Sequence, residues 1–324
     1  MSQTPGKPTP EGSQRSGVRY AEVSEDQDGQ RIDNFLLAAL KTVPRSLVYR
    51  LLRTGQVRVN KGRVKPSHKL SSGDSVRIPP VTVPEQKQVR VPRTVIQSLQ
   101  NAIVADEEHW IVLNKPAGIA AHGGTGLSFG VIDGIREIFS DSSIGLVHRL
   151  DKSTSGVMVL AKSRKASVHF QQALIDGKVE KKYVALLGGV LKKPREVNAR
   201  LRKTHPTDRE NLVIIDPQNG KEAHSRFSCR VAGKRITFAD VEIETGRTHQ
   251  IRVHAASIKH AVVGDDRYGD EKLNQSIRQL GAKGMFLHAH EIAFPELQSA
   301  DSTAEVLRRF TVSFDPRWLD VVTW

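Results

Sequence analysis

Two polar segments of the sequence carry side chains that could do chemistry together. In 145–163 a single carboxylate, Asp151, stands beside His148 and Arg149, and the apolar run VMVLA follows. A carboxylate surrounded by cations stays ionised at neutral pH, and an ionised carboxylate in a cleft can act as a nucleophile. The segment 244–257, ETGRTHQIRVHAAS, adds two arginines separated by hydrogen-bonding side chains. The residues alone leave a second interpretation open, in which Asp151 caps a turn and pairs with a nearby cation.

Other motifs match known chemistry less well. GLSFG has the spacing of a hydrolase nucleophile elbow around Ser128, but no apolar strand leads into it. The histidine pairs His288 with His290 and His249 with His254 lack the cysteines or the H-E-x-x-H pattern of a metal site. We therefore expect no metal, and a hydrolase that uses Ser128 remains a rival hypothesis.

The chain is strongly basic. Its 324 residues include 49 Lys and Arg against 35 Asp and Glu, which gives a formal net charge of +14. This balance indicates a polyanionic partner, and nucleic acid is the commonest one. No apolar run reaches the roughly 18 residues of a membrane span, so we expect no membrane partner. One cysteine, Cys229, cannot form an internal disulfide, which favours the reducing cytoplasm.

Most of the excess charge lies in one short segment. Residues 31–80 hold eleven Lys and Arg against two acidic residues, a net charge of +9. Apolar residues recur at helical spacing from Ile32 to Leu40, and Pro44 opens a second helix. VRVNKGRVK then predicts a hairpin, so the segment is typical of a small module with a basic face. The cations of this module that we expect to contact RNA are Arg45, Arg50, Arg53, Arg58, Lys61 and Arg63.

Composition divides the chain into four parts. Residues 1–17 are rich in Pro, Gly, Ser and Gln and predict a disordered tail. Residues 18–80 form the basic module, and the proline-rich stretch 81–98 predicts an extended linker. Residues 99–324 mix short β-type runs with helical stretches too irregularly for a βαβ repeat. We therefore predict an α+β fold in which a small RNA-binding domain precedes a domain with a mixed, largely antiparallel β-sheet flanked by helices.

The longer motifs resemble the RluA-type pseudouridine synthases. HRLDKSTSG at 148–156 is similar to the catalytic motif of that family, and counterparts also exist for NKPAG, EKKYVALLGG, HPTD, GKEAHSRF, ETGRTHQIRVH and FLHAHEIAF. The likeness covers essentially all of 100–310. Residues 31–78 resemble the alpha-L, S-four-like RNA-binding domain of ribosomal proteins. The helix-pair sequence and HGGTGLSFG look most like the RluC branch of the family.

This resemblance implies the pseudouridine synthase fold and an enzyme that isomerises uridine to pseudouridine without a cofactor. The implied partner is 23S ribosomal RNA or its large-subunit precursor, at the three-uridine target class of the RluC branch. Asp151 matches the family's nucleophile, which acts on a flipped-out uridine, and Arg252 matches its ion-pair partner. Tyr183 matches a tyrosine that stacks on the target base and is a candidate for proton transfer. Arg149 matches an arginine that fills the space of the extruded nucleotide. The other residues that we expect to contact RNA are His148, Lys115, Arg247, His249 and Gln250.

Several alternatives stay open at this point. The target could be that of the RluD-like synthases, or the chain could be a non-catalytic RNA-binding factor of ribosome assembly. The carboxylate of Asp151 could act at the anomeric carbon or at carbon 6 of the uracil ring. Because the sequence shows no exposed apolar repeat, we expect a monomer.

Overall fold

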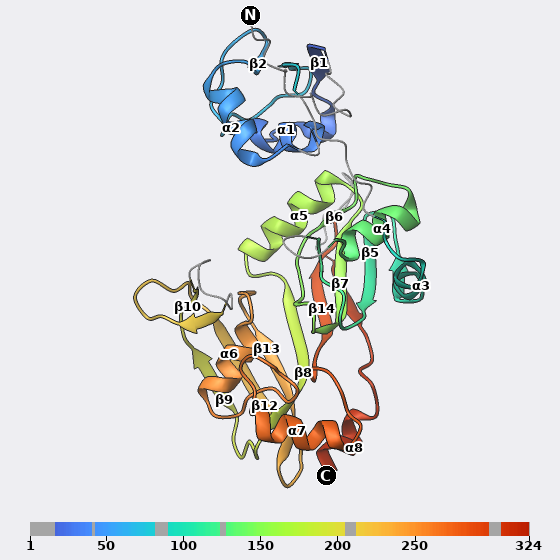
Figure 1. The fold of residues 1–324 in the computed structure, drawn as a ribbon, viewed down its shortest axis with the longest axis vertical. Coiled ribbons are helices and arrows are strands. Elements are labelled where there is room, and N and C mark those ends of the chain that lie inside the picture. Colours follow the sequence, from blue (N-terminus) through green and yellow to red (C-terminus); the bar gives the residue numbers. More distant parts are fainter. Residues whose placement is uncertain are drawn as a thin grey trace, which may run out of the picture. The chain divides into compact units, whose positions relative to one another are not determined.

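The computed structural model describes residues 17–40, 43–81, 90–123, 128–204, 212–297 and 306–323. The chain divides into two compact units, Met1–Val89 and Arg90–Trp324 (Figure 1). The predicted tail 1–17 lies outside the described residues except for Gly17, and so does the central part of the predicted linker, 82–89. In the part of the chain that the structure describes, no helix is both long and apolar enough to cross a membrane.

The first unit pairs two helices with a three-stranded antiparallel sheet of order β1-β3-β2. Its elements are β1 (Arg19–Glu22), a 3-10 turn (Glu25–Gln27), α1 (Ile32–Leu40), α2 (Arg45–Arg53), β2 (Arg58–Val59) and β3 (Ser75–Ile78). The predicted apolar stripes of both helices are buried together, with Ile32 and Leu36 of α1 and Val48 of α2 all fully enclosed. This confirms the predicted helix pair.

The predicted hairpin after α2 is only partly present. The chain turns at Asn60 and Lys61, which both have positive φ, but the second arm makes only a single bridge, between Gly62 and Val59. Strand β2 pairs with the more distant β3 instead. Pro66 has no amide hydrogen to donate to a β ladder, which is consistent with this departure from a regular hairpin.

The second unit is larger and opens with a helix that the sequence analysis missed. Its first half contains α3 (Arg93–Asn101), β4 (Ile103–Asp106), β5 (Trp110–Lys115), α4 (Val131–Phe139), β6 (Gly145–Leu146), β7 (Ser155–Ala161), α5 (Arg164–Ile175) and β8 (Glu180–Gly188). Helix α3 occupies the end of the stretch predicted as an extended linker. Pro92 stands at its N-cap, where the missing amide hydrogen costs nothing, and Leu99 anchors the helix in the core.

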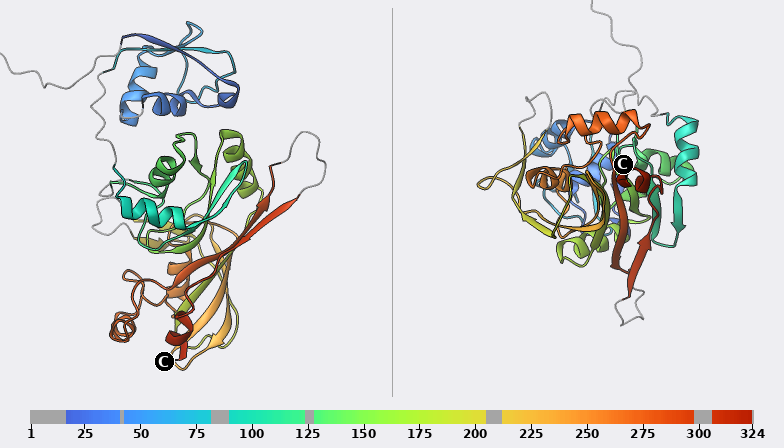
Figure 2. Two further views of the ribbon diagram at one scale, coloured as in Figure 1. Left: turned by 90° about the vertical axis from the view of Figure 1, so that its right-hand side faces the viewer. Right: turned by 90° about the horizontal axis from the view of Figure 1, so that it is seen from below.

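The second half of this unit completes the sheet and adds three short helices. Its elements are β9 (Arg195–Asn198), β10 (Leu201–Lys203), β11 (Val213–Ile215), β12 (His224–Ala232), β13 (Ile236–Ile243), α6 (Gln250–Ser257), α7 (Glu271–Gln279), β14 (Leu287–Pro295), β15 (Leu307–Thr311) and α8 (Trp318–Thr323). Figures 1 and 2 show α3, α4 and α5 near the β5–β7 part of the sheet, whereas α6 and α7 lie near β12 and β13.

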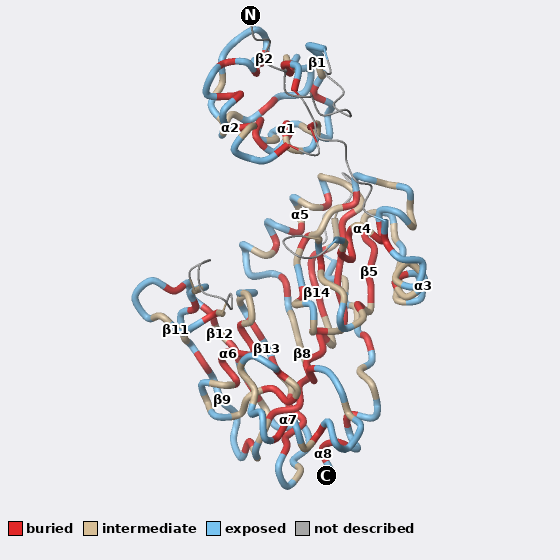
Figure 3. The backbone as a smooth tube through the Cα atoms, viewed as in Figure 1, coloured by how far each residue is buried: buried red, intermediate tan, exposed pale blue. Residues whose placement is uncertain are grey.

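Ten strands form one sheet, with the main order β4-β5-β7-β14-β8-β13-β12-β9. Strand β14 runs parallel to β7, and the other pairings are antiparallel, which confirms the predicted mixed, largely antiparallel sheet. The buried residues follow the central strands (Figure 3). The sheet is therefore the rigid support on which the polar loops are held.

The contact between β7 and β14 fixes the loop that carries Asp151. The two strands pair at Ser155 with His288 and at Gly156 with Ala289. Gly156 has a φ of +113°, and a Cβ there would lie 2.2 Å from the carbonyl oxygen of Ala289. Only glycine fits such an approach, so the last residue of HRLDKSTSG is required by packing.

Candidate active site

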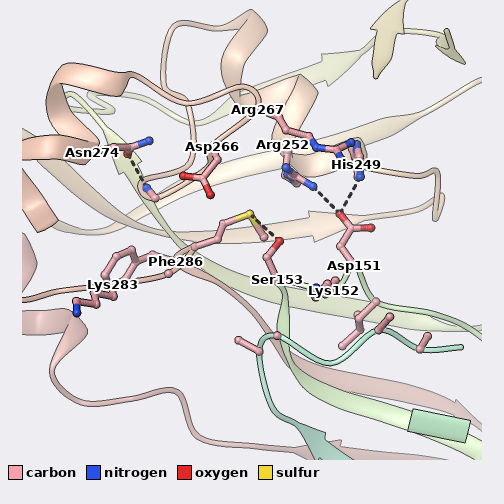
Figure 4. Close-up of a pocket in the computed structure, with 18 of the residues that line it drawn as sticks. Asp151, Lys152, Ser153, His249, Arg252, Asp266, Arg267, Asn274, Lys283 and Phe286 are labelled. Atoms are coloured by element: carbon pink, nitrogen blue, oxygen red, sulfur yellow. Dashed lines mark hydrogen bonds and ion pairs between the residues drawn. The ribbon is translucent and has the colours of Figure 1, made fainter. Parts of the chain in front are cut away.

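The polar segments predicted to act together meet at one cleft of about 1240 Å³ in the second unit. Asp151 comes from the loop before β7, and Arg252 comes from the first turns of α6 (Figure 4). Both side chains line the cleft, together with His249 at the N-cap of α6. Positive side chains dominate the charged part of the lining: Arg149, Lys152, Lys203, Arg252, Arg267, Arg278 and Lys283.

Arg252 joins Asp151 to a second, buried carboxylate. Its Nη1 donates to Oδ2 of Asp151 at 3.2 Å, while its Nε and Nη2 donate to the two oxygens of Asp265 at 2.7 and 2.8 Å. The side chain of Asp265 is fully buried, and that of Asp151 is 18% exposed. The planar guanidinium is thus locked by the buried acid and offers one N–H to the accessible one.

This arrangement keeps the arginine charged. Burial lowers the pKa of Arg252, but the hydrogen bonds and charges of Asp265 and Asp151 outweigh that effect and raise it above its ordinary value. Burial raises the pKa of Asp265, and the bonds from Arg252 reverse this and lower it. The buried pair is therefore ionised, and the cation that faces Asp151 does not depend on pH in the neutral range.

Tyr183 of β8 lies close enough to Asp151 to be affected by its charge. Tyr183, Asp151 and Arg252 all line one small recess next to the main cleft. Burial raises the pKa of Tyr183, and the negative charge of Asp151 raises it further. Tyr183 therefore stays protonated, so its hydroxyl is a proton donor in the resting site and its ring offers a flat, neutral face. The structure thus brings together the three residues predicted as catalytic.

His148 was predicted to contact RNA, but its ring is turned into the protein. Its Nε2 accepts a hydrogen bond from the amide of Val159 at 2.9 Å, and the ring stacks on Phe170. Burial lowers the pKa of His148 to about 3, with a smaller contribution from Lys181. The neutral ring therefore ties the loop of Asp151 to β7.

Lys115 was also predicted to contact RNA, and its side chain is fully buried at the end of β5. The ammonium donates to the carbonyl oxygens of Pro116 and Ile119 at 2.8 Å and to that of Lys152 at 3.3 Å. Burial lowers the pKa of Lys115 to about 7, and the charge of Asp151 acts in the opposite direction. All three donors are used within the protein, so Lys115 fastens the loop after β5 to the loop of Asp151.

Gln250 is a third residue that the structure places in the interior. Its Oε1 accepts from Thr245 and from the amide of Arg247, and its Nε2 donates to His224 and Ser225. The amide has no capacity left for RNA. Sequence reasoning recognised that this segment mattered but could not tell which side chains face inward.

The remaining predicted RNA contacts are accessible or lie at the cleft. Arg149 is exposed and lines both the cleft and the recess of Tyr183. Arg247 is exposed and donates to the carbonyl oxygen of Glu222 at 2.9 Å. His249 lines the cleft beside Asp151. The six predicted cations of the first unit are all exposed: Arg45, Arg50, Arg53, Arg58, Lys61 and Arg63.

Sequence reasoning missed three residues near the site. Asp265 and Tyr268 belong to one turn, VVGDDRYG, and the ring of Tyr268 lies 5.1 Å from the guanidinium carbon of Arg252. The available signal was an acidic pair after an apolar run, which any surface turn also shows. Lys181 lies two residues before Tyr183, on the same face of β8. Burial and the charge of Arg247 lower the pKa of Lys181.

The competing sites receive less support. Ser128 is exposed, and within the described residues its side chain has no hydrogen bond to a histidine or a carboxylate. Its neighbours at 124–127 lie outside the described residues, as does the HPTD motif. His288 and His254 bond the hydroxyls of Ser155 and Ser225, each at 2.9 Å. In the described segments, no group of three His, Cys, Asp or Glu side chains has a geometry that could hold a metal ion.

The buried neutral histidines predict a loss of stability in acid. Burial lowers the pKa of His249 and of His288 from 6.5 to about 4. Between these pH values the unfolded chain binds more protons than the folded one, so the free energy of unfolding falls as the pH drops from 6.5 to 4. Each histidine contributes on the order of 3 kcal/mol to this loss. Urea unfolding at a series of pH values will measure the loss, and His288→Gln will reduce it. A stability that stays level over this range would contradict the assignment.

Comparison with known proteins identifies related proteins over most of the chain. The family model described as RNA pseudouridylate synthase matches residues 109–257, and the S4 domain model matches residues 30–76. The chain is 41% identical over 304 residues to the ribosomal large subunit pseudouridine synthase C of Haemophilus influenzae, which covers 93% of this chain and 92% of that protein. It is 43% identical over 295 residues to the synthase of the same name from Pasteurella multocida, with coverage of 90% and 89%.

Solved structures support the fold of the second unit. The human RNA pseudouridylate synthase domain containing 4 superposes with a TM-score of 0.54 at 21% identity, over 70% of this chain and 93% of that one. The human RNA pseudouridylate synthase domain containing 1 gives a TM-score of 0.53 at 22% identity, over 70% of this chain and 94% of that one. With these matches and the synthase C relatives, the chain belongs to the RNA pseudouridylate synthase family, in its RluC branch, and carries an S4 domain ahead of the synthase domain.

Proposed function

We propose that this protein isomerises specific uridines of 23S ribosomal RNA to pseudouridine, with Asp151 as the nucleophile. One observation carries the proposal: Asp151 is the accessible carboxylate held by a buried arginine, in a recess shared with Tyr183 beside a cleft lined by cations. The names of the synthase C relatives support ribosomal RNA of the large subunit as the substrate, because these names refer to the ribosomal large subunit. The target class of the RluC branch is the first expectation, and that of the RluD-like synthases is the alternative.

The reaction needs a nucleophile and a positioned base but no oxidant or energy source. The bond between the sugar C1′ and uracil N1 breaks, the uracil turns, and C1′ forms a bond to C5. The hydrogen of C5 leaves as a proton and N1 gains one, so atoms and electrons balance. Asp151 can start this sequence by attack at C1′ or at C6 of the ring, and both routes remain open.

The neighbours of Asp151 suit this chemistry in different ways. Arg252 holds the carboxylate of Asp151 in a fixed direction, and lysine could not reproduce its three simultaneous hydrogen bonds. Tyr183 offers its ring as a stacking face for the flipped uracil. Because its raised pKa keeps Tyr183 protonated, its hydroxyl in the resting site is not the base that removes the C5 proton. The freed carboxylate of Asp151 or a water molecule is the better base for that step.

A partly buried ammonium beside the site suits a phosphate of the RNA. Lys181 lies on the Tyr183 face of β8, and its Nζ is 3.8 Å from the position of a Cβ on Gly246. Among the described residues no acid pairs with Lys181, and the neighbouring charge that affects its pKa most is Arg247. Two close cations without an acid favour an anion between them, and we assign that place to a phosphate flanking the target uridine.

The exposed cations of the first unit predict a large effect on affinity. Exchanging Arg50, Arg53 and Lys61 for glutamine removes about three phosphate contacts, so the slope of log Kd against log salt will fall in magnitude by about 2–3. The apparent KM for rRNA will rise by about tenfold or more at physiological salt, while kcat stays within about twofold.

A matched control removes the same charge elsewhere. Lys192, Lys193 and Lys234 lie in exposed turns of the second unit, away from the cleft lining. Their triple glutamine variant should bind rRNA with nearly the wild-type salt slope. Equal losses in both triple variants would mean that net charge alone, and not the face of the S4 domain, determines binding.

The proposed reaction is tested with unmodified 23S and 16S transcripts, without cofactor or metal. After incubation with the purified protein, nucleoside chromatography with mass detection should find pseudouridine in the 23S transcript alone, and sequencing of the modified positions identifies the target class. Binding of 23S RNA without any pseudouridine would overturn the proposal and favour a non-catalytic assembly factor.

We also propose that the protein acts as a monomer in the cytoplasm, where large-subunit precursors are made. The described residues expose large apolar side chains singly on several elements, such as Tyr20, Ile175 and Leu280, which is ordinary for a monomer surface. Light scattering after size exclusion tests the first statement, and cell fractionation tests the second.

A further inference from the structure

Two nitrogen atoms converge on the same oxygen of Asp151. Nη1 of Arg252 lies 3.2 Å from Oδ2, and Nε2 of His249 lies 3.8 Å from that atom (Figure 4). Among the described residues no group donates a hydrogen bond to Oδ1. We propose that His249 is a positioning residue that fixes Oδ2 together with Arg252 and leaves Oδ1 as the oxygen that attacks uridine. This inference rests on the proposed function and deepens it.

A hydrogen-bond chain behind His249 is compatible with a ring proton on Nε2, and we base the assignment of the tautomer on it. The amide of Val213 donates to the hydroxyl oxygen of Tyr268 at 2.8 Å, and this oxygen lies 2.9 Å from Nδ1 of His249. Because the hydroxyl accepts from Val213, its own proton is free to go to Nδ1. A neutral imidazole that accepts at Nδ1 carries its hydrogen at Nε2, the atom that faces Asp151.

The charge state of His249 agrees with this geometry. Burial lowers the pKa of His249 to about 4; the charge of Asp151 acts against this, whereas Arg252 and Arg267 add to it. The ring is therefore neutral at physiological pH. Its Nε2 faces Oδ2 at 3.8 Å, a polar contact longer than a hydrogen bond, and the ring does not compete with Arg252 as a second cation.

The backbone holds the ring in this position at a cost. His249 is the N-cap of α6 and has a φ of 52° and a ψ of 19°, in the left-handed region that side chains other than glycine rarely adopt. Such a conformation costs roughly 1–3 kcal/mol and persists where the surroundings require it. Here it places the ring between Tyr268 and Asp151.

The turn that contains Asp265 and Tyr268 holds the side chains of both Arg252 and His249 in place. Asp265 accepts two hydrogen bonds from Arg252. Its Oδ1 also accepts hydrogen bonds from the backbone amides of Arg267 and Tyr268, at 2.9 and 3.2 Å. Tyr268 lies against the guanidinium of Arg252 and bonds the ring of His249. A change at Tyr268 therefore acts on the direction of the Asp151 carboxylate without touching the substrate.

The separate roles of Oδ1 and Oδ2 of Asp151 are compatible with attack at C1′ and with attack at C6. A lone pair of Oδ1 forms the bond to carbon, and the displaced electron pair enters the uracil ring, from the C1′–N1 bond or from the C5–C6 double bond. Oδ2 then becomes the carbonyl oxygen of an ester and keeps its donors. When the ester bond breaks, the carboxylate returns in its original orientation.

Two substitutions of His249 separate this role from an RNA contact. Glutamine places an amide near the position of Nε2, whereas asparagine places one near Nδ1. With saturating 23S transcript, His249→Asn should lower kcat by about tenfold or more and His249→Gln by no more than about threefold, with KM within about twofold for both. Tyr268→Phe, which keeps the ring under Arg252, should resemble His249→Asn. Equal losses for both His249 variants, or a rise in KM at constant kcat, would overturn the proposal.

The ring proton can be observed directly, without RNA. In ¹⁵N NMR spectra of the full chain, the signals of His249, assigned by their loss in His249→Gln, should show a hydrogen at Nε2, and Tyr268→Phe should shift the tautomer. A hydrogen at Nδ1 in the wild type would overturn the proposal. This measurement does not depend on turnover. An inactive wild-type protein would therefore refute the proposed function, whereas the NMR spectra would still show which ring nitrogen of His249 carries the hydrogen.

A crystal structure of Asp151→Asn with a target RNA oligonucleotide tests the assignment of the oxygens. The side-chain atom at the Oδ1 position should lie next to the uridine, while the atom at the Oδ2 position stays on Arg252. The reverse arrangement would overturn the assignment.

Discussion

Replacing Asp151 with asparagine will abolish pseudouridine formation and leave the protein folded. Asparagine has the same shape and still accepts the hydrogen bond from Nη1 of Arg252, but it has no charged oxygen to form a bond to carbon. We expect single-turnover pseudouridine formation on 23S transcript to fall by at least about a thousandfold, in line with the loss of other covalent nucleophiles.

Stability and RNA binding should change little in this variant. Asp151 is partly exposed, and the buried partner of Arg252 is Asp265, so the arginine remains paired. Asp240→Asn is the matched control, because that carboxylate pairs with Arg230 on the surface of the sheet. The control should keep full activity. Substantial turnover by Asp151→Asn would exclude covalent attack by Asp151.

Replacing Arg252 with methionine will damage both activity and stability, and a second substitution will restore only stability. In Arg252→Met the fully buried carboxylate of Asp265 loses its cation, and breaking a buried pair in this way costs about 3–5 kcal/mol. The carboxylate of Asp151 also loses its fixed donor, so we expect kcat to fall by about a hundredfold or more.

The double variant Arg252→Met with Asp265→Asn separates the two effects. The amide removes the buried charge, and its oxygen can still accept the amides of Arg267 and Tyr268. Urea unfolding should recover at least half of the lost free energy, whereas pseudouridine formation should stay as low as in the single variant. Arg230→Met, which breaks an exposed ion pair, should cost at most about 1 kcal/mol. Recovery of activity in the double variant would show that Arg252 acts through stability alone.

The sequence was enough to predict the elements that carry the site. Apolar spacing predicted α1 and α2, because burial on one face leaves a periodic pattern, and the continuous apolar run after Asp151 predicted β7, which is buried on both faces. The motifs also predicted Asp151, Tyr183 and Arg252, which the structure brings to one recess. Helix α3 was missed because Pro84 and Pro92, together with Pro79 and Pro80 just before the predicted linker, favoured an extended segment.

The direction of individual polar side chains could not be predicted in the same way. His148, Lys115 and Gln250 belong to the polar segments, yet their partners are backbone groups or hydroxyls of the interior. Whether a polar side chain faces a cleft or the core depends on tertiary contacts, and residue type does not contain this information. For the same reason Asp265 was missed, although it binds Arg252 more closely than Asp151 does.

Release of tritium from 23S transcript labelled at C5 of uridine tests the central claim most directly. Each conversion replaces the hydrogen at C5 with the sugar carbon, so one tritium enters the solvent for each pseudouridine formed. We predict release by the purified wild-type protein without cofactor or metal, equal in amount to the pseudouridine found in the same sample, and no release by Asp151→Asn. Tight binding of the transcript with no tritium release would contradict the assignment of this protein as the enzyme.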